Sequence, residues 1–114
     1  MSGLRVLHLT HAHPALGDVG GVELYVHALA RARGDAVFTR DRSGPRGLRR
    51  EDGGGYPLWI AGVPNPRAPV FRDTWSAPEV EGLLWEVLQA ERPALVHIHH
   101  LAHLGLGAAR RGPA

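Results

Sequence analysis

Histidine is the residue type best able to do chemistry in this chain, and seven of the eight histidines fall in two clusters. Because imidazole titrates near neutral pH, such residues can transfer protons, form hydrogen bonds to hydroxyl groups or coordinate metal ions. One cluster follows the first apolar run of the chain and the other follows the last. The members are His8, His11 and His13, and then His97, His99, His100 and His103.

The residue types alone leave three interpretations of these clusters open. The imidazoles can bind sugar hydroxyls or transfer protons, they can ligate zinc, or they can fill polar niches in a folded domain. Zinc has the least support, because the spacing H-x-H-H-x-x-H resembles no familiar zinc motif and neither cluster contains a carboxylate. We therefore expect no metal ligands here.

The apolar pattern predicts strands that alternate with helices. Two segments carry an apolar stripe at helical spacing, and the second follows Ser76 and Glu79, which have capping-box spacing. The predicted strands are residues 4–10, 36–40, 56–61 and 94–98. The predicted helices are residues 22–33, the segment from Ser76 to just before Pro93, and a last helix from about residue 101.

This order of elements predicts an α/β domain whose mostly parallel sheet has helices on both faces. Right-handed crossovers place the first strand in the middle, with the last strand beside it. The last strand, 94–98, is almost continuously apolar, so we expect it to be buried on both faces. The two histidine clusters then meet at the carboxyl ends of neighbouring strands, where ligands bind in this architecture.

A glycine-rich turn, residues 17–23 (GDVGGVE), lies between the first strand and the first helix. Backbone amides of Gly20, Gly21 and Val22 at the helix start can bind an anionic group. The glycine order matches neither the dinucleotide-binding fingerprint nor the P-loop of nucleoside triphosphatases. An ordinary tight turn is therefore an equal alternative.

The composition excludes several classes of site and partner. Cysteine is absent and all 13 basic residues are arginines, which excludes thiol nucleophiles, disulfides and Schiff-base lysines. A formal net charge of +2, without interleaved aromatic residues, argues against nucleic-acid binding. No apolar stretch approaches the roughly 20 residues of a membrane span, and no signal peptide opens the chain. We expect a soluble, cytoplasmic protein.

Five arginines fall within residues 40–50, in a glycine-containing segment that we expect to be a loop. Such a cluster can bind phosphate or a polyanion. The simpler interpretation, which we favour, is a solvated loop in a protein whose excess of Arg, Ala, Gly and Pro suggests a GC-rich bacterial gene.

Four separate elements carry a resemblance to a known family. They are the opening strand LRVLHLTHAHP, GGVE at a helix start, FTRD closing the second strand, and LVHIHHLAHLGLG on a later strand and helix. In this order and spacing they resemble the amino-terminal half of a family 4 glycosyltransferase. The resemblance implies a Rossmann-like domain of a two-domain, GT-B enzyme that transfers a sugar from a nucleotide-diphosphate donor with retention of configuration.

The resemblance also implies roles for particular residues. Gly20 and Gly21 match the family's glycine-rich loop, whose amides approach the donor diphosphate, and Glu23 matches the acidic residue that follows. His99 matches the histidine that faces the transferred sugar and is the expected catalytic residue, with His97 as the alternative one strand step away. The remaining histidines are expected contacts on the acceptor side, namely His100, His103, His11 and His13.

The chain departs from the family pattern where it ends, before the second domain with its pair of glutamates. We therefore expect residues 1–114 to form a single, truncated acceptor-side domain of a hexosyltransferase-like enzyme, inactive alone because it lacks the groups that stabilise the departing diphosphate. No cofactor or metal is expected. The expected partners are a nucleotide-sugar donor and a small-molecule, lipid or glycan acceptor. A lipid acceptor would give the protein a peripheral contact with a membrane.

One alternative belongs to a different functional class. A free-standing small α/β binding protein could use the histidine crevice for a metal ion or a protein partner. An incomplete sheet would also leave an unpaired edge, through which self-association is expected.

Overall fold

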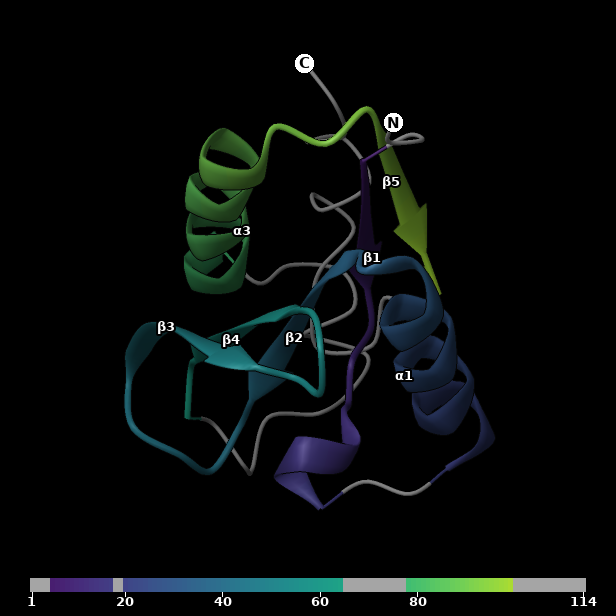
Figure 1. Ribbon diagram of the computed structural model, residues 1–114. Helices are drawn as coiled ribbons and strands as arrows, with labels where there is room; N and C mark the ends of the chain where they lie inside the picture. Colours follow the sequence, from purple (N-terminus) through teal and green to yellow (C-terminus); the bar gives the residue numbers. More distant parts are fainter. Residues whose placement is uncertain (1–4, 18–19, 65–77, 100–114) are drawn as a thin grey trace.

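The computed structural model describes residues 5–17, 20–64 and 78–99 (Figure 1). Within these residues the elements are β1 (Val6–Leu9), the 3-10 helix η1 (Pro14–Leu16), α1 (Gly21–Arg33), β2 (Ala36–Asp41), β3 (Gly47–Asp52), β4 (Pro57–Gly62), α3 (Pro78–Glu91) and β5 (Leu95–Ile98). The five strands form one sheet in the order β3-β4-β2-β1-β5, and the pairs other than β3–β4 are parallel. The predicted α/β class is confirmed.

The two helices follow the apolar stripes of the sequence. Helix α1 ends where Gly34 adopts the left-handed conformation, with φ of 76°, and donates its backbone N–H to the carbonyl oxygen of Ala30. A residue with a side chain is strained in that conformation, which is why the helix stops at this glycine. Helix α3 ends at Glu91, two residues before Pro93, as predicted. Ser76, the predicted cap of α3, lies outside the described residues.

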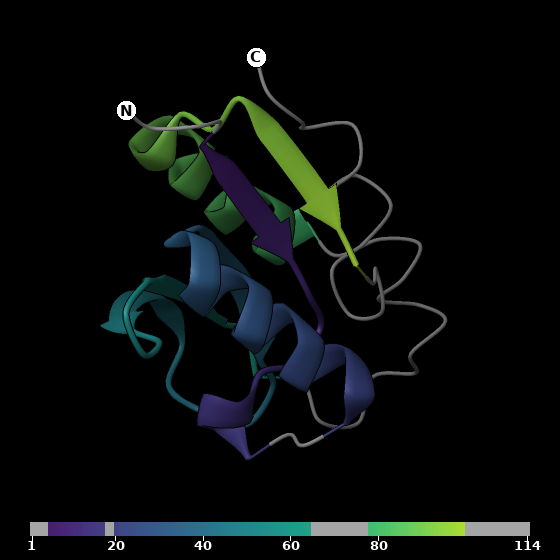
Figure 2. The same ribbon diagram turned by 45° about the vertical axis from the view of Figure 1, so that its right-hand side comes forward.

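The helices cover opposite faces of the sheet and define two core clusters (Figures 1 and 2). On the α3 face, Leu84 and Val87 pack with Leu7, Leu9 and other apolar residues of the strands. On the α1 face, Val26 and Ala30 belong to a cluster that Val37, Tyr56, Leu58 and Ile60 complete. Successive residues of a strand point to opposite faces, so β2 and β4 contribute to both clusters, whereas β1 contributes only to the cluster on the α3 face.

The last strand takes its predicted place beside β1, but its predicted burial is wrong. Strand β5 pairs in parallel with β1 and forms one edge of the sheet (Figure 2). Its Leu95 and Ile98 side chains are 48% and 37% exposed. A run of apolar residues does not show whether a strand has a neighbour on both sides, and among the described residues the outer edge of β5 has none.

The arginine-rich segment is not all loop, which corrects a second prediction. Residues Gly47–Asp52 form β3, which pairs antiparallel with β4 at the other edge of the sheet. The hairpin turn places Gly54 and Gly55 at positive φ, and their amides donate to the Asp52 carboxylate. The sequence LRRED lacks the apolar alternation that marks a strand, because this edge strand lies largely exposed.

The predicted helix from about residue 101 lies outside the described residues. Among the residues that are described, neither helix is long and apolar enough to cross a membrane.

Candidate functional site

Three histidines gather where β1 and β5 run side by side. His8 lies opposite His97 in the parallel ladder, and His99 follows the end of β5. The backbone N–H of His99 donates to the carbonyl oxygen of Leu9 at 2.9 Å, which continues the ladder by one step. Because residues 97 and 99 point to the same face of their strand, all three imidazoles share one side of the sheet. The predicted neighbourhood of the two runs is confirmed.

A chain of hydrogen bonds fixes His8 and His99. The His8 Nε2 atom lies 2.9 Å from Asp35 Oδ2, and His8 Nδ1 lies 2.9 Å from His99 Nε2. Since a carboxylate only accepts, His8 carries its proton on Nε2, and its Nδ1 accepts the N–H of His99. Arg33 Nε donates to the same Asp35 oxygen at 2.7 Å, so the carboxylate is held in place from two sides.

Burial makes both of these imidazoles poor bases. It lowers the pKa of His8, although the hydrogen bond to Asp35 and its charge act in the opposite direction. Burial also lowers the pKa of His99 to about 4, with smaller contributions from His97 and His8. At neutral pH both rings are therefore uncharged, so they bind ligands as hydrogen-bonding groups or through a lone pair.

The surroundings of His99 are open on one side. The ring of Tyr25 from α1 lies edge-on to His99 at 6.1 Å between centroids, and the His97 ring lies at 3.8 Å. Tyr25 is 58% exposed and His97 is also exposed, whereas His8 is buried beneath them. Ligand access is therefore from the solvent side of His97 and His99.

The first histidine cluster splits after β1. His13 is 1% exposed and caps η1, where its Nδ1 accepts the backbone N–H of Ala15. Its Nε2 therefore carries the proton and lies 2.5 Å from Tyr56 Oη, which in turn lies 2.7 Å from His27 Nδ1. Burial raises the pKa of Tyr56 to about 12, so the phenol stays protonated and donates to His27. His13 thus belongs to a second, internal network.

The glycine turn lies at the start of α1, as predicted. Gly20 is the N-cap residue and has no side chain to satisfy the helix, and Gly21 begins the helix. The Glu23 carboxylate folds back over Gly20, so a Cβ at position 20 would collide with it. His11 Nε2 lies 4.0 Å from the Glu23 carboxylate. A negative side chain thus occupies the positive end of the helix dipole, where the sequence predicted an anionic ligand.

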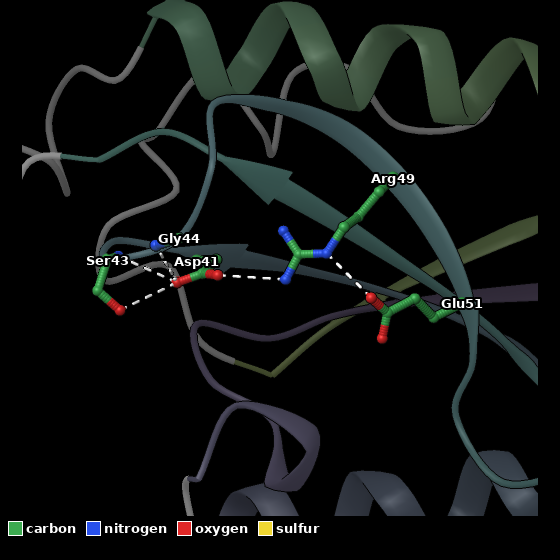
Figure 3. Close-up of polar contacts among 5 residues, drawn as sticks. All are labelled: Asp41, Ser43, Gly44, Arg49 and Glu51. Atoms are coloured by element: carbon green, nitrogen blue, oxygen red, sulfur yellow. Dashed lines mark hydrogen bonds and ion pairs between the residues drawn. The ribbon is translucent and has the colours of Figure 1, made fainter.

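The arginine-rich segment makes its contacts within the protein. The Asp41 carboxylate accepts the backbone amides of Ser43 and Gly44 at 3.0 Å and a guanidinium N–H of Arg49 at 3.2 Å (Figure 3). Burial acts to raise the pKa of Asp41, but these hydrogen bonds outweigh it and the pKa is lowered. Arg49 also donates to Glu51, and buried Arg40 donates to the carbonyl oxygen of Val63. These contacts within the protein favour a structural role for Arg40 and Arg49 over the binding of a polyanion.

A polar hollow of about 400 Å³ opens at the amino ends of the strands, the end opposite to His99. Its charged lining residues include Arg5 and Glu91, which pair at 3.2 Å, and Arg33 and Asp35, which pair at 2.7 Å. The four paired charges neutralise one another and Arg50 leaves the lining with one excess positive charge, but this end of the sheet is not where ligands bind in open α/β sheets. The histidines at the carboxyl ends remain the better candidate site.

Of the predicted site residues, the structure therefore brings His97 and His99 together. It places His13, Gly20 and Glu23 away from them. His100 and His103 lie outside the described residues. Sequence reasoning missed the contribution of Asp35, because this residue follows a helix and carries no motif of its own. The one sequence signal was the place of Asp35 directly before the apolar run 36–40, which is predicted to be a strand.

Comparisons with known proteins identify the family. The family model described as Glycosyltransferase Family 4 matches residues 19–114, which include α1, the sheet strands after β1 and all four histidines of the second cluster. No curated protein and no solved structure matches the chain. The match covers most of the chain. The chain belongs to glycosyltransferase family 4.

Proposed function

We propose that this chain is the acceptor-side, amino-terminal domain of a retaining glycosyltransferase that takes its sugar from a nucleotide diphosphate. The observation that carries the proposal is the position of His99. It follows the carboxyl end of β5, a parallel strand beside β1, where ligands bind in open α/β sheets, and it lies within the matched residues 19–114.

His99 faces the transferred sugar in this proposal. Its Nε2–H donates to His8, so its Nδ1 has a free lone pair that can accept a sugar hydroxyl. Because the ring is uncharged, it orients the sugar without adding a positive charge next to the oxocarbenium-like centre that develops during transfer. His8 and Asp35 act as positioning residues, since they set the tautomer and the orientation of His99.

The amides of Gly20 and Gly21 approach the donor diphosphate. The carboxylate of Glu23 has to move away from Gly20 when the diphosphate arrives, because both compete for the same end of α1. His97 and His100 are contacts for the acceptor. His13 would reach an acceptor only by giving up its hydrogen bond to Tyr56.

The whole enzyme has two domains of the GT-B arrangement, with the nucleotide held mainly by the second. The cleft between them closes over donor and acceptor and excludes the water that would hydrolyse the donor. The chain alone is inactive in this proposal, because stabilisation of the departing diphosphate comes from the other domain. The transferase is of the hexosyltransferase type and uses no metal in the chemical step. Its acceptor is a small molecule, a lipid or a glycan.

A free-standing binding protein has less support. The family model extends across the α1, β2 and β5 regions, and this extent favours a transferase domain over an unrelated α/β protein.

Steady-state transfer assays with a panel of nucleotide-diphosphate sugars test the proposal in a two-domain protein that carries this chain. We expect His99→Ala to lower kcat by about 10²–10³-fold, as loss of a transition-state contact does. His103→Ala, at an expected acceptor contact, is the comparison variant and should lower kcat far less, by less than about 3-fold. Equal, small effects of the two substitutions would remove His99 from the active site. A larger effect of His97→Ala would assign the sugar contact to His97.

A further inference from the structure

One nitrogen from each of His8, His97 and His99 lies within 4.8 Å of the other two. We propose that these three imidazoles form a binding site for a divalent transition-metal ion of the zinc class. The site does not rest on the proposed transferase function, because it needs only the side chains and backbone of this chain.

The backbone itself presents the three ligands. His97 and His99 alternate on β5 and so point to one face, while His8 pairs with His97 across the parallel ladder. No long flexible side chain has to be ordered to bring the rings together. The entropic cost of forming the site is therefore small.

His8 already has the orientation of a metal ligand. Its Nε2–H donates to the Asp35 carboxylate at 2.9 Å, which leaves the Nδ1 lone pair directed at the cluster. A carboxylate that fixes the second nitrogen of a ligating histidine is the common arrangement around protein-bound zinc. The sequence contains no carboxylate within either histidine cluster, and the fold supplies one from the turn after α1.

The three imidazoles lie at different depths, and the site opens to solvent on the His97 side. His8 is buried at the base, His99 is half-buried and His97 is exposed at the rim. Three imidazoles with an open fourth position match the ligand set of a tetrahedral zinc site. Zinc–nitrogen bonds of about 2.0–2.1 Å require the His97 nitrogen to come close to those of His8 and His99, which already lie 2.9 Å apart, and the exposed His97 ring can rotate to do so. Imidazole ligands favour zinc, copper or nickel over magnesium or calcium.

Metal binding replaces the proton between His8 and His99. The proton on His99 Nε2 moves to Nδ1 of the same ring, so the imidazole stays neutral, and His8 Nδ1 and His99 Nε2 both turn their lone pairs to the ion. If His99 also contacts the sugar, the metal and the substrate compete for it. Zinc would then inhibit the transferase and take no part in its chemistry.

Calorimetric titration of the purified chain with zinc chloride tests the site, with cobalt(II) absorption as an optical probe of coordination by nitrogen. We expect one equivalent of zinc with a dissociation constant on the order of micromolar. Because His97 is exposed, His97→Ala should leave the fold intact and weaken binding at least 10-fold. Asp35→Asn should weaken binding by about 10–100-fold. Circular dichroism checks that each variant is folded.

His27→Ala is the matched control, because it also removes one histidine but lies in the other network. It should leave the zinc affinity unchanged, and magnesium chloride should give no heat of binding. The proposal is overturned if wild type binds no zinc, or if His97→Ala binds zinc as tightly as wild type does. These readouts involve no sugar, so a failed transferase assay does not affect them.

Discussion

Two histidine networks contact the same helix and differ in what they leave available to a ligand. At the β1–β5 edge, His99 packs against Tyr25 of α1, with one ring nitrogen bonded to His8. Under the first turn after β1, His13 packs against His27 of the same helix, and Ala15 and Tyr56 engage both of its ring nitrogens. Residue type does not separate them. The two networks differ in burial and in how many ring nitrogens already have a hydrogen-bond partner. We therefore assign ligand binding to the first network and stability to the second.

The largest expected effect comes from breaking the internal network. His13→Ala removes a ring that is 1% exposed, leaves a small cavity and deprives Tyr56 Oη of a hydrogen-bond donor. We expect the free energy of unfolding to fall by about 2–4 kcal/mol, measured by urea denaturation. A loss below about 0.5 kcal/mol would show that His13 is not a structural residue and would return it to the acceptor side.

A pH titration of Tyr56 tests whether the second, internal network holds its phenol as described. The chain has two tyrosines, so in a Tyr25→Phe variant the ultraviolet titration of phenolate absorption reports Tyr56 alone. We expect a midpoint of about 12 in the folded state and about 10 in urea. Because the folded-state pKa is the higher one, the contribution to stability is present below pH about 10 and is lost as the pH rises towards 12. A folded midpoint near 10 would show that the phenol is not held between the two histidines.

The smallest effect is expected at the rim of the first network. His97→Ala removes an exposed ring that no described residue holds by a hydrogen bond, and it should change the free energy of unfolding by less than about 0.5 kcal/mol. The same denaturation experiment measures it beside His13→Ala. If His97→Ala cost more than about 1 kcal/mol, His97 would have a structural role and the contrast between the networks would fail.

The sequence predicts the framework of this molecule well and its polar networks poorly. Helix α1, helix α3 and the pairing of the first and last runs follow from periodicity and crossover rules, which act on many residues at once. The separation of His13 from His8 does not follow, because the chain turns into η1 after β1 and the alternation of the strand ends there. Asp35 and His8 are 27 positions apart, and no local pattern joins them.

The two wrong predictions about the sheet, one for β3 and one for β5, have a related cause. Strand β3 was missed because Leu48-Arg49-Arg50 has no apolar alternation, and β5 was expected to be buried because its apolar run looks like that of a central strand. Both strands lie at an edge of the sheet: the charged sequence of β3 suits that position, whereas β5 is more apolar than an edge strand usually is. Edge position depends on the order of pairing in three dimensions, which a window of neighbouring residues does not contain.

The pairing of β1 with β5 has a consequence for when the site can exist. His8 and His99 are 91 positions apart, so the contact between them closes nearly the whole chain into a loop. Such long-range contacts form slowly, because the entropy of loop closure is lost before any contact is gained. A nascent chain or a partly folded intermediate can build β1, α1, β2 and the β3–β4 hairpin and still have no site. The histidine cluster thus reports that folding is complete, and no early intermediate can bind its ligand.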